Sequence, residues 1–433
     1  MRARTGSMAV AWLLALAGVS QGAGAIDLTP DSEAWRSPAR VEADLRLAGE
    51  ATPEPTDPKL PAEAPRPIEL RFGLAYTQEK LNPAGDGAAR VARLVDGATG
   101  PNRLLVAHED AAGACVVSAD GVLTRNQLDR VQLPADPLDI DTLLPAGELL
   151  PTDSWQADPA AVQRVLRVDS TTLCEVTGVI ETSTARHAKL RFAGPVHGLA
   201  DGARVEIDLR GVALFDRQTR RITRLNLAWR EERAVGPATP ALTATAKLNL
   251  KIQPPEEGHT LDAVDRLIAE TTRLDRRLAI TTGGAGWRLL ADRDWFVVAG
   301  DRHATTLRRV TGDGVSMLTT LAPSASTRMT LATLEQEIRY TLGSDLATVL
   351  STEQTPRADG ETIAIASAGK LDGRPVEWRH HHVSTDGVAI AATTTLPTLT
   401  GPADDAPLRR LLESLEPTGA AESAASRASA FRR

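Results

Sequence analysis

Four segments between residues 188 and 252 decide the fold: AKLRFA at 188–193, ARVEIDL at 203–209, RLNLAWR at 224–230 and TATAKLNLKI at 243–252. In each segment apolar residues alternate with polar ones, so an extended chain would have one apolar and one wet face. This alternation is typical of an antiparallel sheet that is buried on one side. The wet faces of the first three segments run basic, acidic and basic, which predicts opposite charges paired across neighbouring strands.

The same alternation continues on both sides of a proline-rich stretch at 53–67, in Val41–Leu47 and Ile68–Tyr76. Proline has no N–H to donate to a strand ladder, so the stretch predicts a loop that joins two strands of one domain. We expect these strands to form a second sheet over the apolar face of the first, helped by a short helix at 159–167. If that cover is incomplete, the exposed apolar face predicts a lipid or partner site.

The chain begins with an export pattern. Arg2 and Arg4 precede a short apolar run at 8–19, and Ala23-Gly24-Ala25 has the small-x-small spacing of a signal peptidase site. The pattern predicts a signal peptide at 1–25, a mature chain that starts at Ile26, and a secreted or periplasmic location. No later apolar run approaches the ~20 residues of a membrane helix, so no membrane span is expected after signal cleavage.

Length and composition limit the functional classes. With 433 residues, the chain exceeds the size at which single cores stop growing, so at least two domains are expected. The hydrophobic fraction of 42% is that of a globular protein. The net charge of −7 gives no support for nucleic acid as a partner.

Composition shifts predict the domain boundaries. Pro254-Pro255 marks a break between domains. After it, apolar residues at helical spacing predict a helix that begins after Thr260, a helix at 331–342 capped by Thr330 and a closing helix at 408–415. Short strands are expected between these helices. The predicted organisation is a flexible start at 26–38, an antiparallel β-rich domain at 39–253, a linker at 254–259, an α+β domain at 260–418 and a disordered tail at 419–433.

Two resemblances accompany these patterns. Gly286-Trp287, the Asp372-Gly373-Arg374-Pro375 turn and Ser414-Leu415-Glu416, in an order of helix, strands, long helix, hairpins and closing helix, resemble the PsbP-like α/β sandwich over 276–416. That resemblance implies an α+β fold class and an accessory, binding or assembly role. Over 40–253 the chain resembles an exported bacterial family of unknown function, through the pieces Leu143-Leu144-Pro145, Asp153-Ser154-Trp155, Ala213-x-Phe215-Asp216 and 222–233.

Residues 380–382 form the one cluster with metal-binding chemistry, a run of three histidines. On a strand His380 and His382 share a face, and two imidazoles need a third ligand to hold a metal ion. Neither His303 nor Glu377 can be placed beside them by spacing, so the simpler hypothesis is a solvated strand face without metal or other cofactor. Ser367-x-x-Lys370 matches the S-x-x-K motif of enzymes with a serine nucleophile, but the partner motifs S-D-N and K-T-G do not follow it.

The two cysteines leave two alternatives open. Cys115 and Cys174 could form one disulfide in an oxidising compartment, or they could be two separate buried thiols. The sequence as a whole therefore predicts an exported, non-enzymatic binding or scaffolding protein with an unknown envelope or extracellular partner. The alternatives are a carrier of an apolar ligand in the β-rich domain and a metal-dependent enzyme near His380 and His382.

Overall fold

The computed structural model describes residues 24–31, 38–53, 64–81, 90–110, 113–255, 275–281, 287–301, 303–311, 314–324, 329–357, 360–385, 388–397 and 406–417. Strands account for 62% of the structure and helices for 14%. The predicted signal peptide, linker, helix behind Thr260 and C-terminal tail lie wholly or almost wholly outside the described residues.

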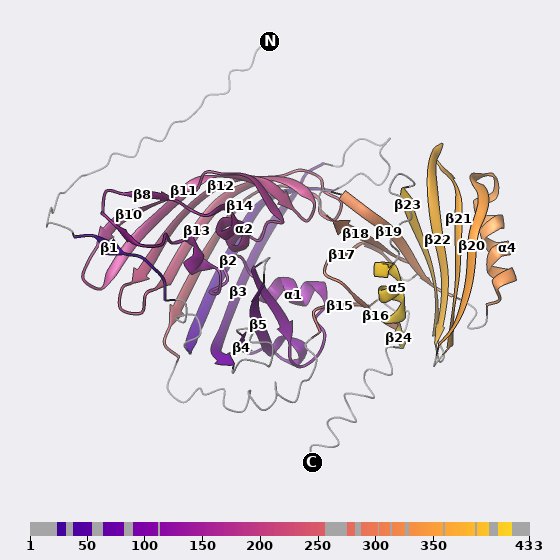
Figure 1. The fold of residues 1–433 in the computed structure, drawn as a ribbon, viewed down its shortest axis with the longest axis horizontal. Helices are drawn as coiled ribbons and strands as arrows, with labels where there is room; N and C mark the ends of the chain where they lie inside the picture. Colours follow the sequence, from indigo (N-terminus) through magenta and orange to yellow (C-terminus); the bar gives the residue numbers. More distant parts are fainter. Residues whose placement is uncertain are drawn as a thin grey trace, which may run out of the picture.

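The N-terminal half is built on one large antiparallel sheet of twelve strands (Figure 1). The four segments at 188–252 form neighbouring antiparallel strands of a meander at its centre, and inward and outward positions alternate along them as the apolar pattern predicts. In spatial order the strands are β6 (Gly113–Ser118), β5 (Leu104–Asp110), β4 (Arg90–Val95), β3 (Arg66–Leu81), β2 (Ala39–Thr52), β14 (Ala241–Gln253), β13 (Arg221–Arg233), β12 (Ala203–Asp216), β11 (His187–Ala200), β10 (Thr177–Ser183) and β8 (Ser154–Gln156), with β9 (Ser170–Cys174) beside β11.

The strands on either side of the proline-rich stretch do not form a second sheet, which corrects the prediction. β2 pairs with β3, as expected, but it also pairs with β14, so both strands extend the first sheet. The inward face is instead covered by α1 (Arg125–Val131), α2 (Pro159–Leu166) and the connection at 132–144 with its 3-10 turn η3 (Ile140–Leu143), and Figure 1 shows the sheet bending over the two helices.

Buried charges tie that connection to the sheet. The Arg93 guanidinium on β4 makes two hydrogen bonds of 2.7 and 2.6 Å to the Asp136 carboxylate, and both residues are almost fully buried. Asp139 accepts from the backbone N–H of Ala114 at 3.1 Å, and Asp141 accepts from that of Ile222 at 2.7 Å. The connection is therefore held by polar contacts as well as by apolar burial.

Residues 26–31 and 38, the described part of the predicted flexible segment at 26–38, differ from that prediction. Ile26 and Asp27 form β1, which pairs with β7 (Glu148–Leu149). Ile26 is 2% exposed and Leu28 fully buried in the core of the large sheet. Both side chains therefore pack on the domain.

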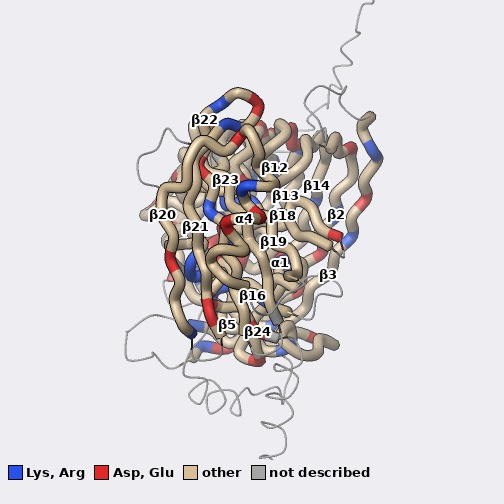
Figure 2. The backbone as a smooth tube through the Cα atoms, turned by 90° about the vertical axis from the view of Figure 1, so that its right-hand side faces the viewer, with Lys and Arg blue, Asp and Glu red and all other residues tan. Residues whose placement is uncertain are grey.

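The C-terminal half contains a seven-stranded antiparallel sheet and a smaller one. The seven strands are, in spatial order, β17 (Trp295–Gly300), β18 (Thr305–Thr311), β19 (Gly314–Pro323), β23 (Val388–Pro397), β22 (Arg374–Thr385), β21 (Gly360–Leu371) and β20 (Leu346–Arg357). The smaller sheet joins β15 (Leu278–Thr281), β16 (Trp287–Ala291) and β24 (Glu416–Pro417). Figure 2, viewed from the side of α4 and β20, shows acidic and basic residues interspersed along both halves.

The predicted fold class, α+β with a PsbP-like α/β sandwich as the second domain, is wrong. The protein is mostly β, and the described part of its C-terminal half has only two α-helices, α4 (Leu331–Leu342) and α5 (Ala406–Glu413). The apolar pattern of the sequence predicts neither β18 nor β20. Strand β20 is exposed on both faces at the sheet edge, so it has no apolar alternation that a sequence pattern could detect.

The two helices cover opposite sides of this sheet's core. α4 buries Leu334 and Ile338 against Ile363 and Ile365 of β21, with Leu331 and Leu342 partly buried beside them, as the spacing predicts. α5 packs with Trp287, Trp295 and the strands β19 and β23 in a separate cluster.

The halves are in direct contact. Leu278 of β15 lies in the core of the large sheet, and the Ala279 N–H donates to the Leu123 carbonyl at 2.8 Å. The domain boundary at 254–259 remains a prediction.

Candidate functional site: the outer face of the large sheet

The outer face of the large sheet has a row of cations on neighbouring strands. Arg71 of β3 lies opposite Arg46 of β2, and Arg46 lies opposite Lys247 of β14. Lys247 lies opposite Ala228 of β13, which in turn lies opposite Arg210 of β12. We call Arg71, Arg46, Lys247 and Arg210 the cationic row. All four side chains are on the outer face, because alternate residues of a strand point to opposite sides and a neighbour of each cation (Phe72, Leu45, Leu248 and Leu209, in the order of the row) packs in or against the core.

The prediction of opposite charges paired across the first three segments holds for Asp208 of β12, which lies opposite Arg230 of β13, but Lys189 and Arg191 of β11 lie opposite Leu214 and Val212. The recorded ion pairs on the row run along single strands instead, each from an arginine to the carboxylate two residues before it. The N···O distances are 2.9 Å for Arg46–Asp44, 3.3 Å for Arg71–Glu69 and 3.5 Å for Arg210–Asp208. Within the described residues no ion pair is recorded for Lys247.

Like charges directly opposite each other destabilise a sheet, on the scale of about 0.2–1 kcal/mol for each pair. The row contains two such pairs in succession, Lys247–Arg46 and Arg46–Arg71. The ion pairs along the strands are solvent-exposed and contribute little. Placing these cations side by side therefore does not stabilise the fold. Binding of a partner is a better physical explanation for their arrangement.

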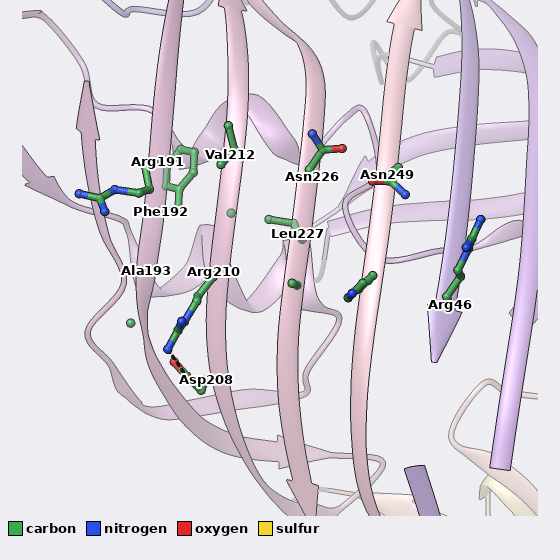
Figure 3. Close-up of a pocket in the computed structure, with 14 residues that line it drawn as sticks. Arg46, Arg191, Phe192, Ala193, Asp208, Arg210, Val212, Asn226, Leu227 and Asn249 are labelled. Carbon is green, nitrogen blue, oxygen red and sulfur yellow. Dashed lines mark ion pairs between the residues drawn. The ribbon is translucent and has the colours of Figure 1, made fainter. Parts of the chain in front are cut away.

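The row borders a hollow of about 840 Å3 on the same face, shown in Figure 3. Small residues, among them Ala193 and Ala228, leave space between longer side chains, and the core residues Phe192 and Leu227 lie beneath it. Arg191, Arg210 and Arg46 stand around the hollow with the amides of Asn226 and Asn249 (Figure 3). Arg191 adds a further exposed cation for which no ion pair is recorded in the described chain.

The sequence analysis did not find this site, although it identified each strand that carries it. Arg46 and Lys247 are about 200 residues apart, and only the register of β2 on β14 places them face to face. The sequence pattern does predict that each cation lies on the outer face of its strand. It does not predict which residues of neighbouring strands lie opposite each other.

The three histidines are buried rather than solvated, in contrast to the simpler hypothesis. Side-chain hydrogen bonds connect His380 to Ser367 at 3.3 Å and to Thr393 at 3.4 Å, and connect His382 to Ser324 at 3.2 Å. No group of three His, Cys, Asp or Glu residues that could hold a metal ion occurs among the described residues. Ser367 is fully buried, so its hydroxyl is closed to a substrate.

The burial of His380 predicts a pH-dependent stability. Desolvation lowers its pKa from 6.5 to about 4, so the folded state binds fewer protons than the unfolded state between those values. Stability from this residue is complete above about pH 6.5 and is lost as the pH falls towards 4. We expect the wild type to lose about 1–2 kcal/mol more than His380→Gln between pH 7 and pH 5.

Urea unfolding at the two pH values measures that difference. The comparison between variants is needed because burial raises the pKa of Asp139 and Asp141 to about 6, which favours the folded state on acidification. A substitution of the exposed His303, His303→Gln, is the control. Equal pH dependence in wild type and His380→Gln would contradict the prediction.

The two cysteines are free thiols in the structure. Cys115 is buried on β6, and Cys174 is half-buried on β9, which pairs with β11 rather than with β6. The arrangement corresponds to the alternative of two separate thiols.

Comparisons with known proteins give no family. No family model and no curated protein sequence matches the chain. Among solved structures it is similar to MucB in a complex with MucA(peri), at 14% identity and a TM-score of 0.18, over 89% of this chain and 96% of that one. It is also similar to OpdQ of Pseudomonas aeruginosa, at 10% identity and a TM-score of 0.12, over 83% and 96% of the chains. A BenF-like porin from Pseudomonas fluorescens Pf-5 matches at 8% identity and a TM-score of 0.12, over 83% and 97%. Likenesses of this size establish neither a shared fold nor a shared activity.

In the part of the chain that the structure describes, no helix combines the length and the apolar character needed to cross a membrane.

Proposed function

We propose that the protein is an exported, non-enzymatic binding protein of the cell envelope that docks an acidic segment of a partner protein on the cationic row. The observation that carries the proposal is the succession Arg71, Arg46, Lys247 on three neighbouring strands. Carboxylates of a partner would relieve the repulsion between these side chains, which the protein's own residues relieve only in part.

The hollow beside the row supports an extended or turned segment as the occupant. Its small floor residues admit the partner's side chains, while Asn226 and Asn249 offer amide hydrogen-bond partners to a backbone. Export is supported by the N-terminal pattern of Arg2, Arg4 and the apolar run at 8–19.

The two alternative functions have less structural support. Carriage of an apolar ligand needs free apolar space inside the sheet, but inward residues such as Leu190 and Leu248 are fully buried in a packed core. A metal-dependent enzyme needs a third ligand beside His380 and His382, and the neighbours recorded for them are hydroxyl groups.

The test is binding of a fluorescent 12-residue glutamate-rich peptide, followed by anisotropy at low salt. We expect the triple variant Arg46→Gln/Lys247→Gln/Arg210→Gln to bind at least about tenfold more weakly than wild type, which corresponds to about 1.4 kcal/mol spread over three contacts. The affinity of the wild type should fall with added salt, since exposed charges are screened.

A matched control removes three other cations from the same face, in Lys189→Gln/Arg224→Gln/Arg230→Gln. The overall charge changes equally, so this variant separates general attraction from docking on the row. Equal weakening in both triple variants, or no measurable binding to wild type, would contradict the proposal.

A further inference from the structure

A second site lies where the two halves of the protein meet, and two arginines cross this junction in opposite directions. Arg125 at the start of α1 donates to the backbone carbonyls of Arg293 and Trp295, and its guanidinium lies 4.5 Å from the centre of the Phe296 ring. Arg293 reaches back and donates to the Val116 carbonyl of β6 at 2.5 Å.

Arg293 is a half-buried cation whose recorded acceptors are all neutral. Besides the Val116 carbonyl, these are the Arg276 carbonyl at 2.9 Å and the Gln132 side-chain oxygen at 3.5 Å. The adjacent carboxylates are engaged elsewhere, because Asp292 pairs with Arg410 at 3.1 Å and Asp294 with Arg309 at 2.8 Å. A buried charge without a counter-charge is costly.

The surroundings of Arg293 add to the excess of positive charge. Burial lowers the pKa of Arg293, and Arg276, Arg125 and Arg167 lower it further, against an opposing effect of Cys115. Arg167 is half-buried, and its closest recorded acceptor is the Ala114 carbonyl at 3.4 Å, with Asp136 and Asp139 raising its pKa against the effect of burial. Several guanidinium groups therefore gather at one point of the junction.

These arginines line a cavity of about 460 Å3. Arg125, Arg167, Arg276 and Arg293 share it with the amides of Gln132 and Gln163 and with the Cys115 side chain. Three carboxylates, Asp129, Asp169 and Asp201, lie on it too. Asp201 pairs with Arg233 at 3.4 Å, outside the four arginines of the cavity. Four guanidinium groups thus face three carboxylates, one of which already has a partner outside the cavity.

We propose that this cavity binds a small oxyanion, a solute with a phosphate or carboxylate group, between Arg167 of the first half and Arg293 of the second. A guanidinium offers a planar fork of N–H donors that fits two oxygens of such a group. The bound anion would supply the counter-charge that Arg293 lacks. Because its ligands come from both halves, it would also strengthen the junction.

The test is a titration of the full chain with inorganic phosphate and, separately, with succinate, at constant ionic strength in a chloride background. Calorimetry should show saturable binding of at least one anion, and the unfolding temperature should rise with its concentration. We expect Arg293→Gln and Arg276→Gln each to weaken binding at least about tenfold. Arg276 is exposed, so its substitution tests the site even if Arg293→Gln fails to fold.

Arg210→Gln on the cationic row is the control, and it should bind the anion as the wild type does. Absence of saturable binding of both anions, or equal weakening in Arg210→Gln, would overturn the inference. Absence of anion binding would leave peptide docking at the cationic row untouched, whereas equal weakening in Arg210→Gln would place the anion on that row.

Discussion

Arg93→Ala is expected to destabilise the protein by about 3–5 kcal/mol, the largest effect of a single substitution that we predict. The Arg93 side chain is 1% exposed, and that of its partner Asp136 is 4% exposed. The guanidinium also lies 4.9 Å from the centre of the Tyr76 ring. Removing it leaves a buried carboxylate without its counter-charge, which costs far more than the ion pair itself contributes. Urea unfolding at pH 7 measures the change.

Two controls separate this cause from loss of bulk. The double variant Arg93→Met/Asp136→Leu removes both charges and keeps apolar volume, so it should recover most of the lost stability. Arg46→Ala breaks the exposed pair with Asp44 and should change stability by no more than about 1 kcal/mol. A loss in Arg93→Ala no larger than in Arg46→Ala would show that the connection at 132–144 is not held by this pair.

Ile338→Ala should cost about 2–5 kcal/mol through lost burial and the cavity it leaves. Ile338 is 4% exposed and packs with Leu334, Ile363 and Ile365 in the small cluster between α4 and the seven-stranded sheet. Unfolding of the full chain by urea, followed by circular dichroism, measures the effect.

Tyr340 on the same helix provides the matched control, because it is 90% exposed. Tyr340→Ala removes a larger side chain but should change the unfolding free energy by less than about 0.5 kcal/mol. Equal losses in the two variants would mean that α4 is not held on the sheet by Ile338.

Local features of the fold could be predicted from the sequence because their causes are local. The cap of α1 is an example: the Thr124 side chain accepts from Gln127 N–H, and the Gln127 side chain accepts from Thr124 N–H. The Asp372-Gly373 turn is another, with φ values of +51° and +76° that suit a tight hairpin. Strand alternation in β11–β14 likewise follows from each segment alone.

Features that depend on distant partners could not be predicted. The exposed edge strand β20 has no apolar period, and without β18 and β20 the C-terminal half resembled an α+β sandwich rather than a seven-stranded sheet. The buried His380 side chain finds its hydrogen-bond partners on other strands, in the hydroxyl groups of Ser367 and Thr393. The cationic row depends on the register of four strand pairs, of which β14–β2 joins segments far apart in the chain.

The unfolding free energy of Lys247→Gln distinguishes a cationic row that serves a partner from one that stabilises the fold. Lys247 lies opposite Arg46 and has no recorded ion pair in the described residues, so its removal relieves repulsion. We predict that the unfolding free energy rises by about 0.2–1 kcal/mol at low salt. The increase should shrink in about 1 M salt, where the Debye length is about 3 Å and the repulsion is screened. Lys189→Gln, which breaks a 2.8 Å pair with Glu181, should show no such gain. A loss of stability in Lys247→Gln at low salt would assign the lysine to the fold and contradict the account.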